Sequence, residues 1–422
     1  MELFYNKSSK EFLLNFISIL FCLLPAALIS GPFLSDLFIS IIAIIFLYLT
    51  FKYKLYDFYK KRFFYLAAFL YLAMIFSSLL SDDIFYSFKN SFFYIRFVLF
   101  TLCIAFLLEN NKTVIKYFAY SLFITIFVLL VDSYIQYITG YNILNWERSS
   151  RLTSFFGNKA VLGTFLSKMI ILSFAIFYML GPINKSKMIL ALIFLVLAEI
   201  IVFLSGDRSA LFLLTVSTVI IICLVDKLKY LRLLSFFIAI ILISLITILD
   251  QDIKKRVIDT TSEQIGLSDS GEKVNYFSPT HEELALTAIN QFKDSPFFGH
   301  GLKVFRIKCS DPKYAVGNGC STHPHNTYLQ LLSEVGLVGA LPVLISLIFV
   351  MMQLFNHTIN VLRRKRRVLY DHEICLYTLF FINLFPLIPT LSFFNNWNSI
   401  MIYLPVCFIL ISSDSNKDTK KI

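Results

Sequence analysis

Charged residues are scarce in this sequence. Only 15% of its 422 residues are Asp, Glu, Lys or Arg, whereas 57% are hydrophobic and the mean hydropathy is +0.73. Ordinary soluble domains contain about 25% charged residues, so the composition excludes that class of protein. It indicates a chain that crosses a membrane several times.

A basic stripe interleaved with aromatic residues, which is typical of nucleic-acid binding, is missing from the hydrophilic segments. The formal net charge of +11 arises instead from short Lys and Arg clusters between apolar runs. We therefore expect no nucleic-acid partner, and we attribute the basic excess to membrane topology.

Apolar runs of about 20 residues, long enough to cross a bilayer, recur along the chain. The first follows Lys7 and Lys10, as a signal peptide would, but the many later spans favour an uncleaved first helix. The sequence therefore predicts an all-α integral membrane protein. We expect about twelve membrane helices, near residues 12–30, 33–51, 63–80, 92–108, 114–138, 159–180, 187–204, 209–225, 231–249, 335–355, 374–391 and 398–413.

Lys and Arg are concentrated in alternate short loops and at both ends of the chain. The positive-inside rule places these segments in the cytoplasm, and the one large hydrophilic segment then lies on the outer face. We divide the chain accordingly into membrane helices (1–249), an outer loop domain (250–334), and the last membrane helices with a cytoplasmic tail (335–422). The basic loops are 52–62, 184–187, 226–232 and 363–367.

The second part of the outer loop reads "SPTHEELALTAINQFKDSP" at 278–296. Thr280 and Glu283 have the spacing of a capping box, and Pro296 is a stop signal. With apolar residues such as Leu284 and Ala288 on one side, this segment predicts a helix along the bilayer surface.

Five of the seven cysteines lie inside apolar spans, and only Cys309 and Cys320 lie in the outer loop. In an oxidising compartment the two are expected to form a disulfide. The alternative is a zinc site with His323 and His325, although this spacing matches no common zinc pattern.

Three arginines lie where the positive-inside rule does not explain them: Arg96, Arg151 and Arg208, all at outer helix ends. Each has a simple interpretation, either contact with lipid headgroups or pairing with Asp82, Asp83 or Asp207. Their convergence on one face favours a pocket for an anion, because guanidinium offers paired donors to phosphate.

His325 and Asn326 directly precede a helix-like run, "TYLQLLSEV". A histidine near the positive end of a helix tends to stay neutral, and a neutral imidazole can accept a proton. A histidine that only caps a helix or contacts headgroups is the simpler alternative. The surrounding arginines and the outer face favour a base.

The order of these motifs resembles that of the O-antigen ligases and the related O-antigen polymerases. The segments concerned are "SGDRSA" (205–210), "DSPFFGHGLKVF" (294–305), and "HN" followed after nine residues by "GLVG" (325–339). The His-Asn-x9-Gly pattern is the most specific of them. The similarity covers most of the chain in span count, loop position and motif order.

The resemblance implies an inverting, metal-independent glycosyltransferase of the GT-C type in the bacterial inner membrane, acting in lipopolysaccharide biosynthesis. Its donor is a glycan on undecaprenyl diphosphate, and in ligases the acceptor is a sugar hydroxyl of lipid A-core. The family's catalytic histidine falls on His325 and its loop arginine on Arg208, and no cofactor is implied. A second arginine, frequent in the family at the start of the long-loop helix, is replaced here by His281. Either His281 substitutes for it, or Arg256 or Arg306 reaches the diphosphate.

Other functions remain to be weighed. A divalent cation is conceivable at Asp82 and Asp83 or at Asp250 and Asp252, although both pairs read more simply as solvated helix ends. A polysaccharide or lipid transporter is disfavoured because the sequence has no internal repeat and few mid-membrane charges. A structural scaffold would not need the arginine and histidine set. The polymerase, which joins lipid-linked repeat units, is the nearest rival of the ligase.

Overall fold

The computed structural model describes residues 2–148, 151–182, 184–255, 259, 262 and 278–419, without the side chains of residues 2–8, 252 and 413–419. These residues are almost entirely helical, and their one β-bridge joins Tyr141 to Glu147. Arg256 and the side chain of Asp252, which the sequence raised as candidates, lie outside the described residues.

The protein is an all-α integral membrane protein. In the described part of the chain, nine helical segments are long and apolar enough to span a membrane. They are α1 (Glu2–Ser30), α2 (Pro32–Tyr53), α3 (Arg62–Leu79), α4 with α5 (Ile84–Phe92, Ile95–Asn110), α6 (Thr113–Thr139), α7 (Leu162–Met179), α8 (Lys185–Leu204), α10 (Lys229–Leu249) and α15 (Thr327–Leu362).

The remaining predicted spans are shorter helices. Two of them, α9 (Arg208–Leu224) and α17 (Asn396–Thr419), are apolar but below the span length over their apolar part. The third, α16 (Asp371–Asn383), corrects the predicted span 374–391, because it ends at Asn383. Pro386 and Pro389 follow at once, and proline lacks the N–H that would continue a helix. Residues 384–395 therefore form a non-helical segment, which we call the return loop.

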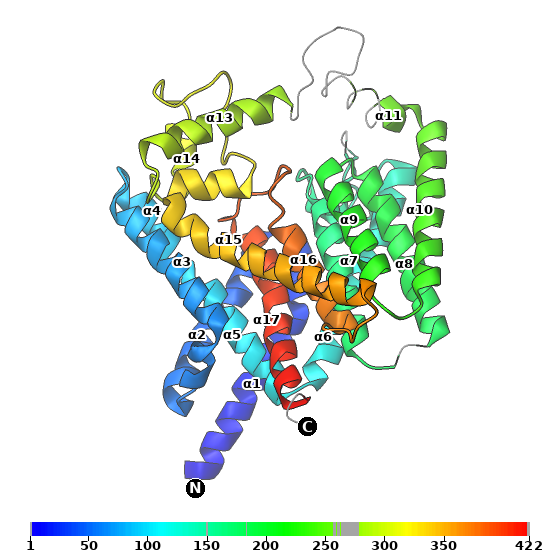
Figure 1. Ribbon diagram of the computed structural model, residues 1–422, viewed down its shortest axis with the longest axis horizontal. Coiled ribbons are helices and arrows are strands. Elements are labelled where there is room, and N and C mark those ends of the chain that lie inside the picture. Colours follow the sequence, from blue (N-terminus) through cyan, green and yellow to red (C-terminus); the bar gives the residue numbers. More distant parts are fainter. Residues whose placement is uncertain are drawn as a thin grey trace.

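The helices pack around an apolar core that joins distant parts of the sequence. α16 packs against α7, and α17 against α5. Phe21 of α1 stacks on Phe118 of α6 with ring centroids 4.3 Å apart, and Phe408 of α17 lies against both rings. α1 begins and α17 ends on the side of the molecule opposite α13 (Figure 1).

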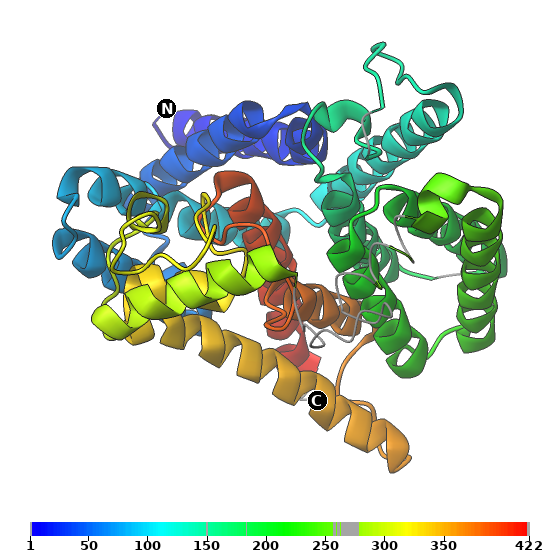
Figure 2. The same cartoon turned by 90° about the horizontal axis from the view of Figure 1, so that it is seen from above.

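The outer-loop helix α13 (Pro279–Asp294) lies over the start of α15 (Figure 2). Its apolar face carries Leu284 and Ala288, which pack on Phe305 of the short α14 (Phe305–Lys308) and on Leu329 of α15. The predicted capping box is wrong, because the N-cap is Ser278 and Pro279 takes the first helical position. Glu283 instead accepts the N–H of Asn318, 3.0 Å away.

α15 is broken at Gly336, whose φ of 64° and ψ of −169° are essentially restricted to glycine. The break exposes backbone groups, and one segment satisfies both sides of it. Pro296 and Phe297 accept the N–H groups of Leu337 and Val338 (2.9 and 3.1 Å). In turn, the N–H groups of residues 300 and 301 donate to the carbonyls of residues 333 and 334 (3.1 and 2.9 Å). The motif "PFFGHG" (296–301) thus holds two half-helices end to end.

Candidate active site

His325 lies immediately before the first half of α15 and adopts the left-handed conformation, with φ of 52°. This conformation is unfavourable for a residue with a Cβ. The surrounding structure fixes it: the N–H of Thr390, in the return loop, donates to the His325 carbonyl at 2.7 Å. Strain held in this way is common at functional sites.

Asn326 is the N-cap of α15 and uses its whole side chain for that purpose. Its Oδ1 accepts the N–H groups of Tyr328 and Leu329 (3.0 and 3.1 Å), while its Nδ2 donates to the carbonyl of Pro386 at 2.7 Å. From its place in the His-Asn motif we predicted Asn326 as a substrate-binding residue, and that role stays a prediction. Its observed contacts fix the start of α15, directly after His325.

Two further histidines flank His325. The His323 ring centroid lies 4.1 Å away and the His281 centroid 5.6 Å away. Nε2 of His323 lies 3.2 Å from the Thr390 carbonyl, and Nδ1 lies 3.1 Å from the Thr322 hydroxyl, so Nε2 carries the proton and Nδ1 accepts one. His323 is therefore engaged on both nitrogens. By contrast, Nε2 of His325 lies 3.5 Å from Ser321 Oγ, at the limit of hydrogen-bond distance.

The pKa of each of the three imidazoles is lowered, which favours the neutral form. Burial, and then the proximity of His281, lower the pKa of His325. Burial and the proximity of His325 lower the pKa of His323 to about 4, and burial also lowers that of His281. The sequence predicted a neutral His325 from the helix end, and burial favours the same form by lowering its pKa.

Cationic side chains adjoin this histidine cluster. Arg306 of α14 is exposed and close enough to His323 to lower its pKa. Lys303 lies beside Arg306 and Arg96, near the carboxylates of Glu334 and Asp36; burial, and then Arg306, lower its pKa. Lys303 was missed by the sequence analysis.

Arg96 is held in an ion pair rather than standing free. Its Nε and Nη2 donate to Oδ1 of Asp36 at 3.0 and 2.8 Å, and its Nη1 donates to the Phe93 carbonyl at 2.6 Å. The sequence had considered other acidic partners, and Asp36 was not among them.

Arg208 begins α9 and is exposed, next to the N-cap Asp207, whose Oδ1 accepts the Ala210 N–H at 3.1 Å. Four residues further along α9, the ring of Phe212 lies 5.6 Å from that of Phe385 in the return loop. The same loop binds the His325 backbone through Thr390. Arg151 lies exposed in the segment before α7. The structure gives no direct contact between either arginine and His325.

A disulfide joins Cys309 to Cys320, with Cα atoms 4.9 Å apart, and it closes the loop before His323. Cys309 is fully buried against α13. The cysteines are therefore not ligands in the zinc arrangement that the sequence left open.

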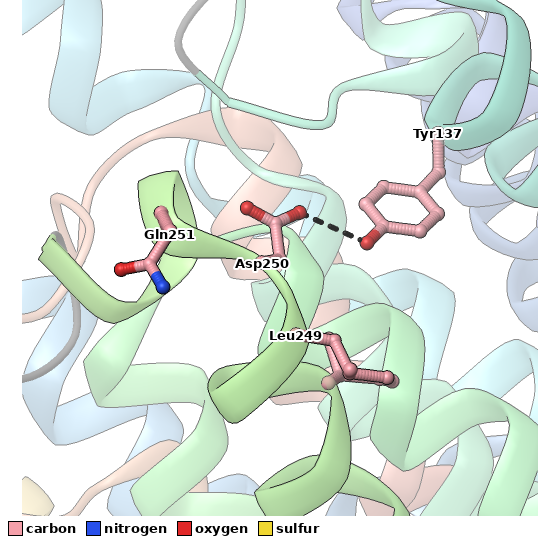
Figure 3. Close-up of a pocket in the computed structure, with 5 residues that line it drawn as sticks. Tyr137, Leu249, Asp250 and Gln251 are labelled. Carbon is pink, nitrogen blue, oxygen red and sulfur yellow. Dashed lines mark hydrogen bonds between the residues drawn. The ribbon is translucent and has the colours of Figure 1, made fainter.

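Three of the four acidic candidates, Asp82, Asp83 and Asp250, have protein partners. Asp82 pairs with Lys308 at 2.5 Å, and Asp83 caps α4 by accepting the Tyr86 N–H at 3.1 Å. Asp250 faces Tyr137 across a pocket, and the Tyr137 hydroxyl donates to it at 3.0 Å (Figure 3). Among the described residues, no group of three or more His, Cys, Asp or Glu side chains is arranged to hold a metal ion.

A comparison with known families identifies a matching region within the chain. Residues 190–344 match the family model described as O-antigen ligase. The chain carries an O-antigen ligase domain. No curated protein matches it significantly. The domain extends from α8 through the outer loop and past the break in α15, so it contains Arg208, Arg306 and His325.

Three residues around the O-antigen ligase domain's histidine cluster went unrecognised in the sequence: Lys303, Glu334 and Thr390. Glu334 belongs to the run "SEVGLVG", where a carboxylate beside a glycine break was a usable signal. Thr390 follows Pro389 in a run that reads as a membrane span, and its closeness to His325 depends on how α16 ends.

Proposed function

We propose that this protein is a membrane glycosyltransferase that transfers a glycan from undecaprenyl diphosphate to a sugar hydroxyl of lipid A-core, with inversion and without a metal. The observation that carries the proposal is the environment of His325 within the O-antigen ligase domain. There His325, whose pKa is lowered by burial, adopts a constrained conformation next to His323, and Arg306 lies close to His323. Such an arrangement suits a reaction that needs both a base and positive charge for a leaving diphosphate.

His325 is proposed as the general base. The acceptor hydroxyl loses its proton to the imidazole while its oxygen attacks the anomeric carbon from the face opposite the diphosphate. The bond between that carbon and the diphosphate oxygen breaks, and the bonding electrons leave with the lipid diphosphate. Attack from the opposite face inverts the configuration. A positioned base typically contributes 10²- to 10⁴-fold to the rate.

The diphosphate needs positive charge in order to leave, and no acid is required for it. Arg306 and Lys303 provide this charge next to the histidine cluster. Arg208 provides it from the start of α9, a helix that contacts the return loop. In this proposal Arg306 takes the place of the missing long-loop arginine. His281 faces His325 at the edge of the site, where it would contact the glycan. Arg151 and Arg96, which is paired with Asp36, add positive electrostatic potential to the site and do not bind the phosphates directly.

The cellular location follows the charge pattern. Lys and Arg are concentrated in the loops on the side where α1 begins and α17 ends, which supports cytoplasmic termini. The histidine cluster is beneath α13, on the opposite side (Figure 1). We therefore propose a bacterial inner-membrane protein whose active site faces the periplasm.

A reconstituted assay tests the activity. Purified protein in liposomes receives an undecaprenyl-diphosphate-linked glycan and lipid A-core, and the products are separated by mass. We expect glycan on lipid A-core and release of undecaprenyl diphosphate. Growth of lipid-linked chains without lipid A-core would identify a polymerase. Movement of intact lipid-linked glycan across the bilayer with no new bond would identify a transporter.

Gene deletion separates the two transferases in cells. Loss of a ligase leaves lipid A-core without any attached glycan while lipid-linked polymer accumulates. Loss of a polymerase leaves lipid A-core that bears a single repeat unit.

A further inference from the structure

Glu334 is a fully buried carboxylate at the end of the first half of α15, two residues before the break. Its Oε2 accepts the backbone N–H of Lys303 at 2.8 Å and the side-chain amide of Gln330 at 3.2 Å. No described residue donates a hydrogen bond to its Oε1. A buried carboxylate is expensive to desolvate and contributes little net stability. Its presence at this position therefore favours a functional role over a stabilising one.

Gln330, one helical turn earlier and 1% exposed, connects Glu334 to the return loop. Its amide nitrogen donates to Glu334 and to Ser392 Oγ (3.0 Å), and its carbonyl oxygen accepts the N–H of Phe393 at 2.9 Å. Both amide protons and the oxygen are therefore used, which fixes the orientation of the side chain. The two residues form one connected chain of hydrogen bonds, which we call the Glu334–Gln330 brace.

The brace joins two parts of the proposed site that are far apart in sequence. On one side is Lys303, in the left-handed conformation with φ of 60° and close to Arg306 and Arg96. On the other is the return loop, whose Thr390 and Pro386 hold His325 and Asn326. The half-helix between them is rigid over about 12 Å, the rise of eight residues.

Hydrogen bonding supplies the second argument. Oε2 of Glu334 accepts two donors, the Lys303 backbone and the Gln330 side chain, whereas no described residue hydrogen-bonds Oε1. A glutamine at position 334 would put a buried amide nitrogen at one of these two positions, where it would either face another donor or lack an acceptor among the described residues. The carboxylate therefore has a role that an amide cannot fill.

Resting on the proposed function, we propose that Glu334 is a positioning residue for the transfer reaction and that Lys303 is a further binding residue for the anionic lipid-linked donor. Glu334 anchors the Lys303 backbone, and the Lys303 ammonium stays close to Arg306. It does not touch the reacting atoms.

A double-mutant cycle tests this in liposomes with lipid-linked glycan and lipid A-core. Glu334→Gln and Lys303→Met are each expected to raise the KM for the lipid-linked donor about tenfold with little change in kcat. The double variant should be no worse than Lys303→Met alone, because both changes remove the same interaction. Glu109→Gln serves as the control. It removes a carboxylate that pairs with Lys61 at the start of α3, whereas Glu334 lies near the end of that helix.

The outcomes separate this inference from the proposed function. Wild-type KM in the Lys303→Met protein, or additive effects in the cycle, overturns the inference. Glu334→Gln that lowers abundance and melting temperature together, with an unchanged KM, shows that the carboxylate is only structural and also overturns it. If Glu334→Gln does not fold at all, Lys303→Met alone decides. Failure of the proposed mechanism would appear in a different measurement, because the His325→Ala protein would then transfer glycan at the full rate.

Discussion

The two halves of α15 are built by different rules. After Gly336 the helix buries apolar or small residues such as Ala340, Val343 and Leu347, and exposes others such as Leu344 and Phe349. Before Gly336, residues 327–335 bury Thr327, Gln330, Ser333 and Glu334, each with a hydrogen bond. The second half is specified by hydropathy and the first by hydrogen-bond partners from two other segments. Changes in the first half should therefore affect activity, whereas changes in the second half should mainly affect packing.

The sharpest test of this contrast is His325→Ala, just before the polar half. We expect glycan transfer to fall at least 10²-fold, because a sugar hydroxyl needs a positioned base, while the protein stays inserted. Transfer by purified protein in liposomes is the measurement, with EDTA included for the wild type. His323→Ala should cost less, since its nitrogens bind Thr322 and Thr390. Retention of more than about a tenth of the wild-type rate by His325→Ala contradicts the base assignment.

Gly336→Ala attacks the junction between the halves. A Cβ at this position would collide with the backbone of Phe297 and Phe298, and the conformation alone costs about 1–3 kcal/mol. We expect a marked fall in abundance and melting temperature in detergent. Gly181→Ala is the matched control, because Gly181 also has positive φ (113°) but open space around its Cα. Equal losses in the two variants would show that the collision has no effect.

Arg208→Lys tests the contribution of α9 to the site. A lysine keeps the charge but cannot present the paired donors of guanidinium to a diphosphate. We expect loss of most transfer, about tenfold or more, at normal abundance. Arg363→Lys, in the basic loop after α15, should be silent. Near-normal transfer by Arg208→Lys would reduce Arg208 to a surface anchor.

The disulfide sets the order of the segment before the histidines. Mass spectrometry of unreduced peptides should find Cys309 linked to Cys320, and free thiols at both would refute the pairing. Cys309→Ser with Cys320→Ser should lower local stability by about 2–3 kcal/mol, visible as faster proteolysis between α14 and α15. Cys223→Ser, on the exposed side of α9, is the control.

The smallest expected effect is a pH dependence. His281, His300, His323 and His325 all have pKa values lowered by burial. Below about pH 6.5 these histidines bind protons in the unfolded chain but stay neutral in the folded loop, so the free energy of unfolding falls as the pH drops. For His323 this loss continues down to about pH 4. Melting temperature should decrease from pH 7.5 to 5, and transfer should lose activity on an acidic limb centred below pH 6.5. A melting temperature constant over that interval contradicts this account.

Sequence alone determined the membrane class, most of the helices and the motif around His325. Hydropathy over about 20 residues is a local property, and the helix expected directly after His325 and Asn326 does begin at Thr327. It also drew attention to Cys309 and Cys320, since no other cysteine of the outer loop competes as a partner.

Only the tertiary structure decided which groups surround His325. The return loop reads as part of a membrane span, yet its prolines end α16 and bring Thr390 to the His325 backbone. Asp36, which lies 60 residues before Arg96 in the sequence, forms an ion pair with it. Glu334 joins Lys303 to Gln330 beside a helix break. Side-chain partners of this kind depend on how segments distant in sequence pack together, and hydropathy and local propensity carry no information about that packing.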